Sequence, residues 1–332
     1  MNRTNFHTFC VGLTEKCNLD CDYCYFQGKR NKTMSKTTAK KSIDFFIDFL
    51  ASKEDEVRII FVGGEVLTEF KLLKELTEYS LNKANSKVKL NFSLDTNATL
   101  LTNEVCEFLK KHSFFVMASL DYPKESHNLH RVFKNTSKGN YDLVLEKIKL
   151  AINVLGREFV SVRATINPDN VDKLSEYVKT MVIIGVKHID FAPNYEVEWD
   201  NKKLVEFSNQ IKVIKNKYYS GKITIKILER FIKNEPTFPY GHPCGLLLTA
   251  NVDGKFFPCT RFVNIDEFSL GSVTDNPAKV LLNIESYCDL LKDSWKKGTF
   301  GCPANNFLLN GEATKKSKIF KKFEESFKEG LK

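Results

Sequence analysis

The sequence reads CNLDCDYC over residues 17–24, directly after a short apolar run. Cys17 and Cys21 are separated by three residues, and Cys21 and Cys24 by two. Thiolates are the usual ligands of iron–sulfur clusters, and three of them can bind three irons of a [4Fe–4S] cube and leave the fourth iron open. A structural zinc site needs a fourth nearby ligand, and the next histidine along the chain is His112. The spacing therefore predicts an iron–sulfur site in the loop after the first strand.

Apolar runs and amphipathic stretches alternate along the first two-thirds of the chain. Ile43, Phe46 and Leu50 share one face of such a stretch, and Ser35 and Thr102 are expected N-caps. Repeated strand–helix units indicate a parallel sheet with right-handed crossovers. Six units predict an α/β fold, an open (β/α)6 partial TIM barrel whose functional loops follow the carboxyl ends of the strands. The expected strands are residues 9–13, 57–62, 89–94, 115–120, 160–166 and 188–191, and the expected helices are residues 35–50, 69–83, 102–111, 140–155, 170–184 and 201–219.

The alternation stops near residue 225. Beyond it the chain contains scattered Pro and Gly, four cysteines and an expected hairpin at residues 246–258 that turns at an Asp-Gly pair. We expect a domain boundary there. It separates the barrel (1–225) from a small α+β iron–sulfur domain (226–332) that ends in a basic helix near residues 314–329.

Composition restricts the functional classes. The 332 residues include 50 basic and 41 acidic side chains, a net charge of +9. This excess indicates either a solvated surface or attraction for an anionic peptide. We find no nucleic-acid recognition motif, no apolar run of the roughly 18 residues that a membrane span needs, and no signal peptide. A cytoplasmic protein is expected, and its nine bunched cysteines favour metal ligation over disulfides.

The motif CNLDCDYCYF resembles that of the radical S-adenosylmethionine (SAM) superfamily, in which an aromatic residue, here Tyr23, also precedes the third cysteine. The resemblance implies that SAM chelates the open iron. Its reductive cleavage would then yield a 5′-deoxyadenosyl radical that abstracts hydrogen from the substrate. Such a cofactor carries the difficult chemistry, while the protein supplies position and excludes water. Cys17, Cys21 and Cys24 would thus be the catalytic and metal-binding residues.

A second segment, FVGGE, matches the family's GGE motif and ends the second expected strand. Gly63 and Gly64 would let the backbone approach a ligand. Glu65 would accept hydrogen bonds from the SAM ammonium group. The alternative for this segment is an ordinary turn at the end of a strand, and Val66 departs from the family's proline.

Three more positions are candidate SAM contacts. Asn97 lies in DTNATLL, which resembles the family's TNGTLL segment, and Ser119 lies in SLD, which resembles a segment whose serine reaches the SAM carboxylate. Arg163, on the fifth expected strand, is a second candidate partner for that carboxylate, with a surface salt bridge as the alternative. Ala98 and Tyr122 replace family glycines and put the shape of the substrate pocket in doubt.

Cys244 and Cys259 frame CGLLLTANVDGKFFPC, a C-x9-G-x4-C spacing. It resembles the SPASM domain or its shortened twitch form, which binds auxiliary [4Fe–4S] clusters in radical SAM enzymes that modify peptides and proteins. Cys302, in GCPA, resembles the last cysteine of that domain. A full SPASM domain has seven or more cysteines, so we predict one auxiliary cluster here. Cys288 is the candidate fourth ligand; as the alternative it is a buried helix cysteine, and the cluster would have an open iron.

The resemblance implies a maturase of ribosomally made peptides that forms a crosslink, a thioether or an epimerised centre. A flavodoxin- or ferredoxin-like protein would donate electrons. The chain starts close to its first strand, so the barrel surface or a separate protein would recognise a leader peptide.

The alternative enzyme is an anaerobic sulfatase-maturating enzyme, which oxidises Cys or Ser to formylglycine. That group has an Asp directly after the cysteine equivalent to Cys259, where this chain has Thr260. A non-catalytic iron–sulfur sensor is an alternative of another class, and the retained GGE motif argues against it.

Overall fold

The computed structural model describes residues 7–26, 30–51, 56–85, 88–219, 221–232, 246–296 and 302–332. The chain forms two compact units. It passes from unit 1 to unit 2 after Cys17 and returns to unit 1 at Tyr25, so Cys21 and Cys24 belong to unit 2. Unit 1 comprises Met1–Cys17, Tyr25–Asp95 and Thr237–Lys316, and unit 2 comprises Asn18–Cys24, Thr96–Pro236 and Ser317–Lys332. The domain boundary expected near residue 225 stays a prediction.

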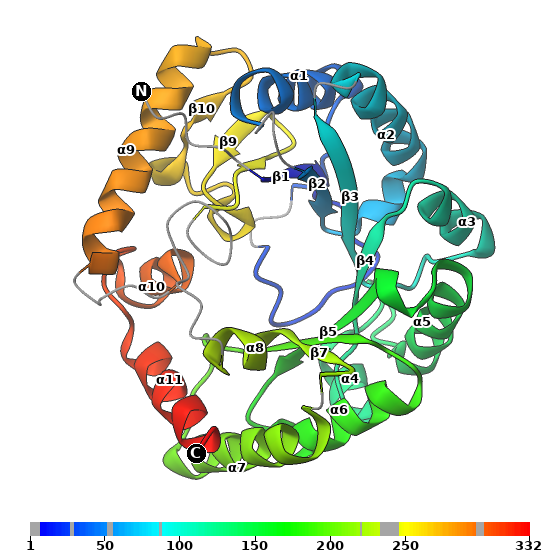
Figure 1. The fold of residues 1–332 in the computed structure, drawn as a ribbon, viewed down its shortest axis with the longest axis vertical. Helices are drawn as coiled ribbons and strands as arrows, with labels where there is room; N and C mark the ends of the chain where they lie inside the picture. Colours follow the sequence, from blue (N-terminus) through cyan, green and yellow to red (C-terminus); the bar gives the residue numbers. More distant parts are fainter. Residues whose placement is uncertain are drawn as a thin grey trace. The chain divides into compact units, whose positions relative to one another are not determined.

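Unit 1 is built on a sheet with the strand order β10-β9-β8-β1-β2-β3 (Figure 1). The strands β8, β1, β2 and β3 run parallel, whereas β9 and β10 continue the edge as antiparallel strands. The strands are β1 (Thr8–Thr14), β2 (Glu56–Gly63), β3 (Lys89–Thr96), β8 (Thr249–Ala250), β9 (Lys255–Phe257) and β10 (Gly271–Ser272). Its helices are α1 (Lys36–Phe45), the π-helical turn η1 (Phe46–Leu50), the 3-10 turns η2 (Val66–Glu69), η5 (Thr260–Phe262) and η6 (Asp266–Phe268), α2 (Phe70–Ala84), α9 (Pro277–Lys296) and α10 (Pro303–Asn310).

Unit 2 contains four parallel strands in the order β4-β5-β6-β7. They are β4 (Phe115–Ser119), β5 (Val160–Ile166), β6 (His188–Pro193) and β7 (Thr224–Ile225). The helices are α3 (Asn103–Lys111), α4 (Lys124–His130), α5 (Tyr141–Leu155), α6 (Leu174–Ile183), α7 (Asn201–Tyr218), α8 (Lys226–Ile232) and α11 (Lys318–Gly330), with 3-10 turns η3 (Arg157–Phe159) and η4 (Val171–Lys173). Strands and helices alternate along the chain, as Figure 1 shows for α3 to α7.

The structure confirms the six strands and the helices expected from periodicity, with ends shifted by a few residues. Both expected N-caps are present: the Ser35 hydroxyl accepts a hydrogen bond from the Thr38 amide at 3.0 Å, and Thr102 caps α3 in the same way. The expected hairpin is formed by β8 and β9, and Gly254 at its turn has φ +79°, a left-handed conformation that favours glycine. Helices α4, α8, α9 and α10 were not predicted.

The basic C-terminal helix α11 packs against α7 within unit 2. Phe323 contacts the rings of Trp199 and Phe207 at centroid distances of 4.7 and 5.2 Å, and Phe327 also lies near Phe207. These aromatic contacts bury one face of the helix. Within the described ranges every helix is too short or too polar to cross a bilayer.

Candidate functional site

In unit 1 the end of β2 lies directly against the segment that leads into the cysteine triplet. The Gly64 amide donates to the Thr14 carbonyl at 2.8 Å, and the Glu65 amide donates to the Lys16 carbonyl at 2.8 Å. A Cβ on Gly63 would lie 2.3 Å from the Thr14 oxygen, and one on Gly64 would lie 2.3 Å from the Lys16 oxygen. The two glycines therefore let the end of β2 pack closely against the backbone of Thr14 and Lys16. This contact positions Lys16, the residue before Cys17.

The Glu65 side chain is buried at the start of η2. Its Oε1 accepts a hydrogen bond from the Leu67 amide at 3.0 Å, so the carboxylate caps this 3-10 turn. A buried carboxylate held in this way keeps one orientation. Its role toward the SAM ammonium group stays a prediction.

In unit 1 an ion pair between the buried Glu15 and the half-exposed Arg30 holds the chain on both sides of the triplet. The Glu15 carboxylate accepts hydrogen bonds from the Arg30 guanidinium at 2.6 Å and from the Asn264 amide at 3.1 Å. Arg30 also pairs with Asp253, in the hairpin turn, at 2.6 Å. Burial by itself raises the pKa of Glu15, but the hydrogen bonds from Arg30 and Asn264 outweigh it and hold that pKa below its usual value. These bonds therefore link the hairpin turn to the residues that precede and follow the cysteine triplet.

In unit 2 the residue after Cys17 is held by amide hydrogen bonds. The Asn97 Nδ2 donates to Asn18 Oδ1 at 2.8 Å, and the Asn18 Nδ2 donates to Thr99 Oγ1 at 2.8 Å. Ala98 adopts φ +66°, a left-handed conformation in which a β-carbon is strained. Asn97 therefore positions the triplet loop, while its contact with SAM stays a prediction.

The loop 18–24 also pairs with a segment distant in sequence. The Asp20 amide donates to the Val132 carbonyl at 2.9 Å, and the Lys134 amide donates to the Asn18 carbonyl at 2.9 Å. These bonds run the loop antiparallel to residues 130–134, as two strands would pair. These hydrogen bonds therefore fix the backbone of the loop independently of any bound metal.

Tyr23 anchors the loop to a buried charged group. Its hydroxyl donates to the carboxylate of Asp121, which also forms an ion pair with Arg131 at 2.9 Å. The guanidinium lies 5.2 Å from the centre of the Tyr23 ring. Burial raises the pKa of Asp121, but the Arg131 charge outweighs it and lowers that pKa, so the carboxylate is charged. The Cys21 thiolate is among the anionic groups that act on Arg131. A cation near this cysteine would offset the negative charge of a thiolate-bound cluster.

His127 supports Asp121 from the other side. Its Nδ1 accepts a hydrogen bond from the Asp121 amide at 3.2 Å, and its Nε2 bonds to Asn140 Oδ1 at 3.0 Å. Burial lowers the pKa of His127 to about 4. The imidazole is therefore neutral, with its proton assigned to Nε2 by these two partners.

His130 contacts the triplet loop directly. Its Nδ1 lies 2.7 Å from the Asp22 carboxylate, and its Nε2 lies 3.4 Å from Asp169. Neither His130 nor Arg131 was expected from the sequence, because no motif marks them. Both residues become neighbours of the cysteine loop only because residues 130–134 pair with it in the folded chain.

Ser119 and Arg163 lie opposite each other on the paired strands β4 and β5. The Arg163 guanidinium forms an ion pair with Asp190 of β6 at 2.6 Å, and its side chain is 44% exposed. The salt bridge considered as the alternative is therefore present. Contacts of Ser119 and Arg163 with the SAM carboxylate stay predictions.

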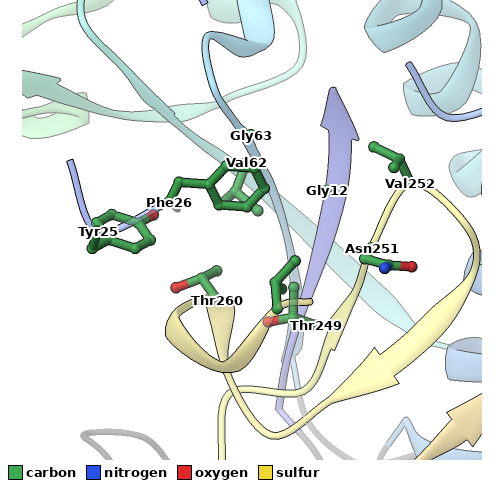
Figure 2. Close-up of a pocket in the computed structure, with 10 residues that line it drawn as sticks. Gly12, Tyr25, Phe26, Val62, Gly63, Thr249, Asn251, Val252 and Thr260 are labelled. Atoms are coloured by element: carbon green, nitrogen blue, oxygen red, sulfur yellow. The ribbon is translucent and has the colours of Figure 1, made fainter. Parts of the chain in front are cut away.

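A pocket in unit 1 brings separate motifs together (Figure 2). Gly63 of the GGE segment, Tyr25 and Phe26 after the triplet, and Thr260 beside Cys259 all line it. Thr249, Asn251 and aliphatic side chains complete the walls, and no charged side chain occurs among the described residues that line it. The pocket is small, with room for little more than one water molecule, and its described lining is uncharged.

The C-terminal cysteines are placed by short elements of unit 1. Cys259 follows β9 and begins η5, and Cys302 precedes α10 as its N-cap residue. Burial raises the pKa of the Tyr287 phenol in α9, and the charges of Cys259, Cys302 and Cys288 raise that pKa further. Cys259 and Cys302 therefore lie within electrostatic range of the same phenol. Neither Tyr287 nor this convergence was expected from the sequence.

Cys288 is buried in α9, and burial raises the pKa of its thiol to about 12. The charged groups that act on it are Lys292, Asp289 and Glu285 of the same helix. Cys244 lies outside the described residues. The auxiliary-ligand roles of Cys244, Cys259, Cys302 and Cys288 therefore stay predictions.

The donor chemistry at the triplet fits an iron–sulfur cluster. Cys17, Cys21 and Cys24 are all half-buried, in a loop held by hydrogen bonds on both sides. Within the described ranges no three Cys, His, Asp or Glu side chains converge on a single metal ion. In a cube each thiolate binds a different iron, so its ligands need not converge in this way.

Comparison with known proteins places these features in a family. The model of the radical SAM superfamily matches residues 11–181, which is more than half of the 332-residue chain. The serine-type anaerobic sulfatase-maturating enzyme of Bacteroides thetaiotaomicron is 25% identical over 338 aligned positions, which cover 90% of this chain and 80% of that enzyme.

Two solved structures share the fold. Native anSMEcpe with bound AdoMet and Kp18Cys peptide superimposes with a TM-score of 0.78 at 19% identity, covering 97% of this chain and 95% of that one. Streptococcus suis SuiB bound to precursor peptide SuiA gives a TM-score of 0.69 at 12% identity, covering 96% and 76%. The fold is therefore the partial TIM barrel of radical SAM enzymes, and this chain belongs to the radical SAM superfamily, whose members bind a [4Fe–4S] cluster and SAM.

Proposed function

We propose that this enzyme modifies a ribosomally synthesised peptide, forming a crosslink, a thioether or an epimerised centre. When bound, the cluster and SAM supply the 5′-deoxyadenosyl radical that removes a hydrogen atom from the peptide. The structures of SuiB and anSMEcpe were both obtained with peptides, which supports a peptide substrate for this chain as well.

The uncharged pocket carries this proposal. It connects Gly63 of the proposed SAM site with Thr260 beside the proposed auxiliary ligand Cys259. Its described lining offers hydroxyl, amide and apolar groups but no carboxylate base. Formylglycine formation in the sulfatase-maturating group uses an Asp at the position of Thr260. Thr260 therefore favours a reaction that needs no carboxylate base at this position.

The chain's own residues have separate roles in this proposal. Cys17, Cys21 and Cys24 bind the SAM cluster, and the Arg131 cation beside Cys21 offsets its charge. Tyr23 holds the loop through Asp121. The proposed SAM contacts are Gly63, Gly64, Glu65, Asn97, Ser119 and Arg163.

We propose one auxiliary [4Fe–4S] cluster bound by Cys244, Cys259 and Cys302, with Cys288 as the candidate fourth ligand. Such a cluster would accept the electron left on the peptide after hydrogen abstraction, or bind the peptide. A flavodoxin- or ferredoxin-like protein would reduce the SAM cluster. A separate protein, or the barrel surface, would recognise the leader of the precursor.

Formylglycine formation is the second candidate, because the Bacteroides relative and anSMEcpe are sulfatase-maturating proteins. One experiment separates the two. Anaerobically reconstituted, reduced enzyme is incubated with SAM and either a short precursor peptide encoded beside its gene or a sulfatase peptide containing Cys or Ser. Released 5′-deoxyadenosine, the peptide mass and capture of aldehydes by a hydrazide are measured.

A crosslinked, thioether-containing or epimerised precursor without aldehyde supports the proposal. A hydrazide-reactive sulfatase peptide supports formylglycine formation instead. Absence of 5′-deoxyadenosine under all conditions contradicts both and leaves the iron–sulfur sensor.

A further inference from the structure

In unit 2 the carboxyl edge of β5 and β6 carries a buried side-chain amide whose donor is unpaired. Asn167, the first residue after β5, is 3% exposed, and its Nδ2 has no hydrogen-bond partner among the residues that the structure describes. Buried polar groups are nearly always hydrogen-bonded, because losing water without a replacement partner is unfavourable. The carboxyl ends of parallel strands are also where α/β sheets bind their ligands.

Neighbouring hydrogen bonds decide which end of the Asn167 amide is unpaired. The Glu196 amide donates to Asn194 Oδ1 at 3.1 Å, so the Asn194 Nδ2 is the end that faces Asn167. This Nδ2 donates to Asn167 Oδ1 at 2.9 Å. Exchanging the oxygen and nitrogen of Asn167 would set two NH2 groups against each other, so the unpaired atom is a donor.

The loop after β5 holds Asn167 in place. The Asn167 backbone amide donates to Asn170 Oδ1 at 2.9 Å, and the Asn170 backbone amide donates to the Asn167 carbonyl at 3.2 Å. The Asn170 Nδ2 in turn donates to Ser126 Oγ at 3.0 Å, and the Ser126 hydroxyl donates to Asp169 at 2.8 Å. These bonds keep the unpaired donor in one position, as recognition of a ligand requires.

Asn167 belongs to a polar face of the β5–β6 pair that is partly accessible. Side chains alternate along a strand. The residues that share this polar face are Arg163, Thr165 and Asn167, beside Asp190, Ala192 and Asn194. Ala192 is exposed, and the Arg163 side chain is 44% exposed. Asp190 pairs with Arg163 at 2.6 Å, so the polar face carries no net charge. An uncharged acceptor therefore suits it.

We propose that the Asn167 Nδ2 donates a hydrogen bond to a main-chain carbonyl of the bound peptide, and that the polar face of β5 and β6 is part of the peptide-binding surface. The inference rests on the proposed function, because it takes the substrate to be a peptide. A main-chain carbonyl is an uncharged acceptor, and it would satisfy the donor that is unpaired in the free protein. Since Nδ2 is shielded in the free protein, peptide binding must also displace the atoms that cover it.

The test measures binding to the full chain reconstituted with iron and sulfide. The probe is the precursor peptide encoded beside its gene, carrying a fluorescent label. Fluorescence anisotropy gives the Kd of the peptide, and equilibrium dialysis gives the Kd of SAM. Asn167→Ala should weaken peptide binding about tenfold and leave SAM binding unchanged, at an iron content equal to that of the parent.

Gln210→Ala is the matched control, because both ends of this amide are paired within the protein. Its Oε1 accepts from the Ser175 amide at 2.8 Å, and its Nε2 donates to Glu206 at 2.8 Å. Gln210→Ala should leave the affinities for peptide and SAM unchanged.

Asn167→Asp separates the loss of the donor from the loss of the bond to Asn194. It keeps an oxygen for the Asn194 Nδ2 but replaces the unpaired donor with an oxygen that repels a carbonyl. Peptide binding should therefore be at least as weak as in Asn167→Ala. Parent-like peptide binding in Asn167→Asp would show that only the bond to Asn194 matters and would overturn the inference.

Two other results overturn it. Unchanged peptide binding in Asn167→Ala would assign the donor to a buried water molecule, and a loss confined to SAM binding would assign it to SAM. If the parent binds the peptide through Asn167 but leaves the peptide mass unchanged, only the proposed function fails. If the parent binds no peptide, the proposed function and this inference both fail.

Discussion

Tyr23, inside the cysteine triplet, donates its hydroxyl hydrogen to the buried carboxylate of Asp121, 98 residues further along the chain. Asp121 is in turn paired with Arg131, and the Arg131 cation acts on the Cys21 thiolate. The loop that carries two of the triplet cysteines is therefore held in part by a buried charge pair. Variants of this group test both stability and cluster binding.

Asp121→Asn should be strongly destabilising. It leaves the Arg131 guanidinium buried without its anion, and breaking a buried pair from one side costs about 3–5 kcal/mol of unfolding free energy. The measurement is urea unfolding of the metal-free protein, followed by iron content after reconstitution. Asp142→Asn is the control because it removes the partner of the exposed Lys124, a surface pair of the kind worth about 0–1 kcal/mol. Equal losses in the two variants would contradict a special role for Asp121.

Gly64→Ala should disrupt the start of the triplet. The new methyl group would lie 2.3 Å from the Lys16 carbonyl oxygen, so the backbone must move, at a cost of about 1–3 kcal/mol. We expect lower iron content and loss of most SAM cleavage. Gly156→Ala is the control: it has φ +92° and open space, so its cost of about 1–2 kcal/mol comes from backbone conformation alone. Gly156→Ala should retain iron, and normal iron in Gly64→Ala would refute the prediction.

His130 should make stability depend on pH. Burial lowers the pKa of its imidazole, but Asp22 and Asp169 outweigh burial and raise it above 6.5. The folded protein therefore holds a proton that the unfolded chain releases. This stabilisation is complete below pH 6.5 and is lost as the pH rises through the folded-state pKa.

Urea unfolding of the parent and of His130→Asn at a series of pH values checks this prediction. The difference in unfolding free energy should shrink as the pH rises. It should be modest and weaken with added salt, because both carboxylates are largely exposed and therefore screened. A difference that does not change with pH would rule out the proton-linked effect.

Cysteine variants separate the two proposed clusters. Cys17→Ala, Cys21→Ala or Cys24→Ala should abolish SAM cleavage, because each removes a ligand of the SAM cluster. Cys259→Ala should retain part of the SAM cleavage but form no modified peptide. The measurements are 5′-deoxyadenosine by chromatography and peptide mass. Equal loss of both activities in Cys259→Ala would show that the C-terminal cysteines serve folding alone.

Local signals in the sequence were sufficient for most of the fold. The period of apolar residues predicted the strands and helices, and caps such as Ser35 and Thr102 marked their ends, because each depends on neighbours a few residues away. Helices α9 and α10 could not be predicted in the same way. Their apolar residues are spread among the cysteine and proline positions of the C-terminal segment, where no regular alternation of strands and helices marks them.

By itself the sequence determined the chemistry of this protein, because the triplet spacing and the GGE segment are local patterns of donor atoms. Only the tertiary structure decided how those atoms are held. Arg131 and His130 reach the triplet only because residues 130–134 pair with the loop 18–24. A local sequence pattern does not reveal such contacts, because they depend on how segments far apart in the sequence pack together.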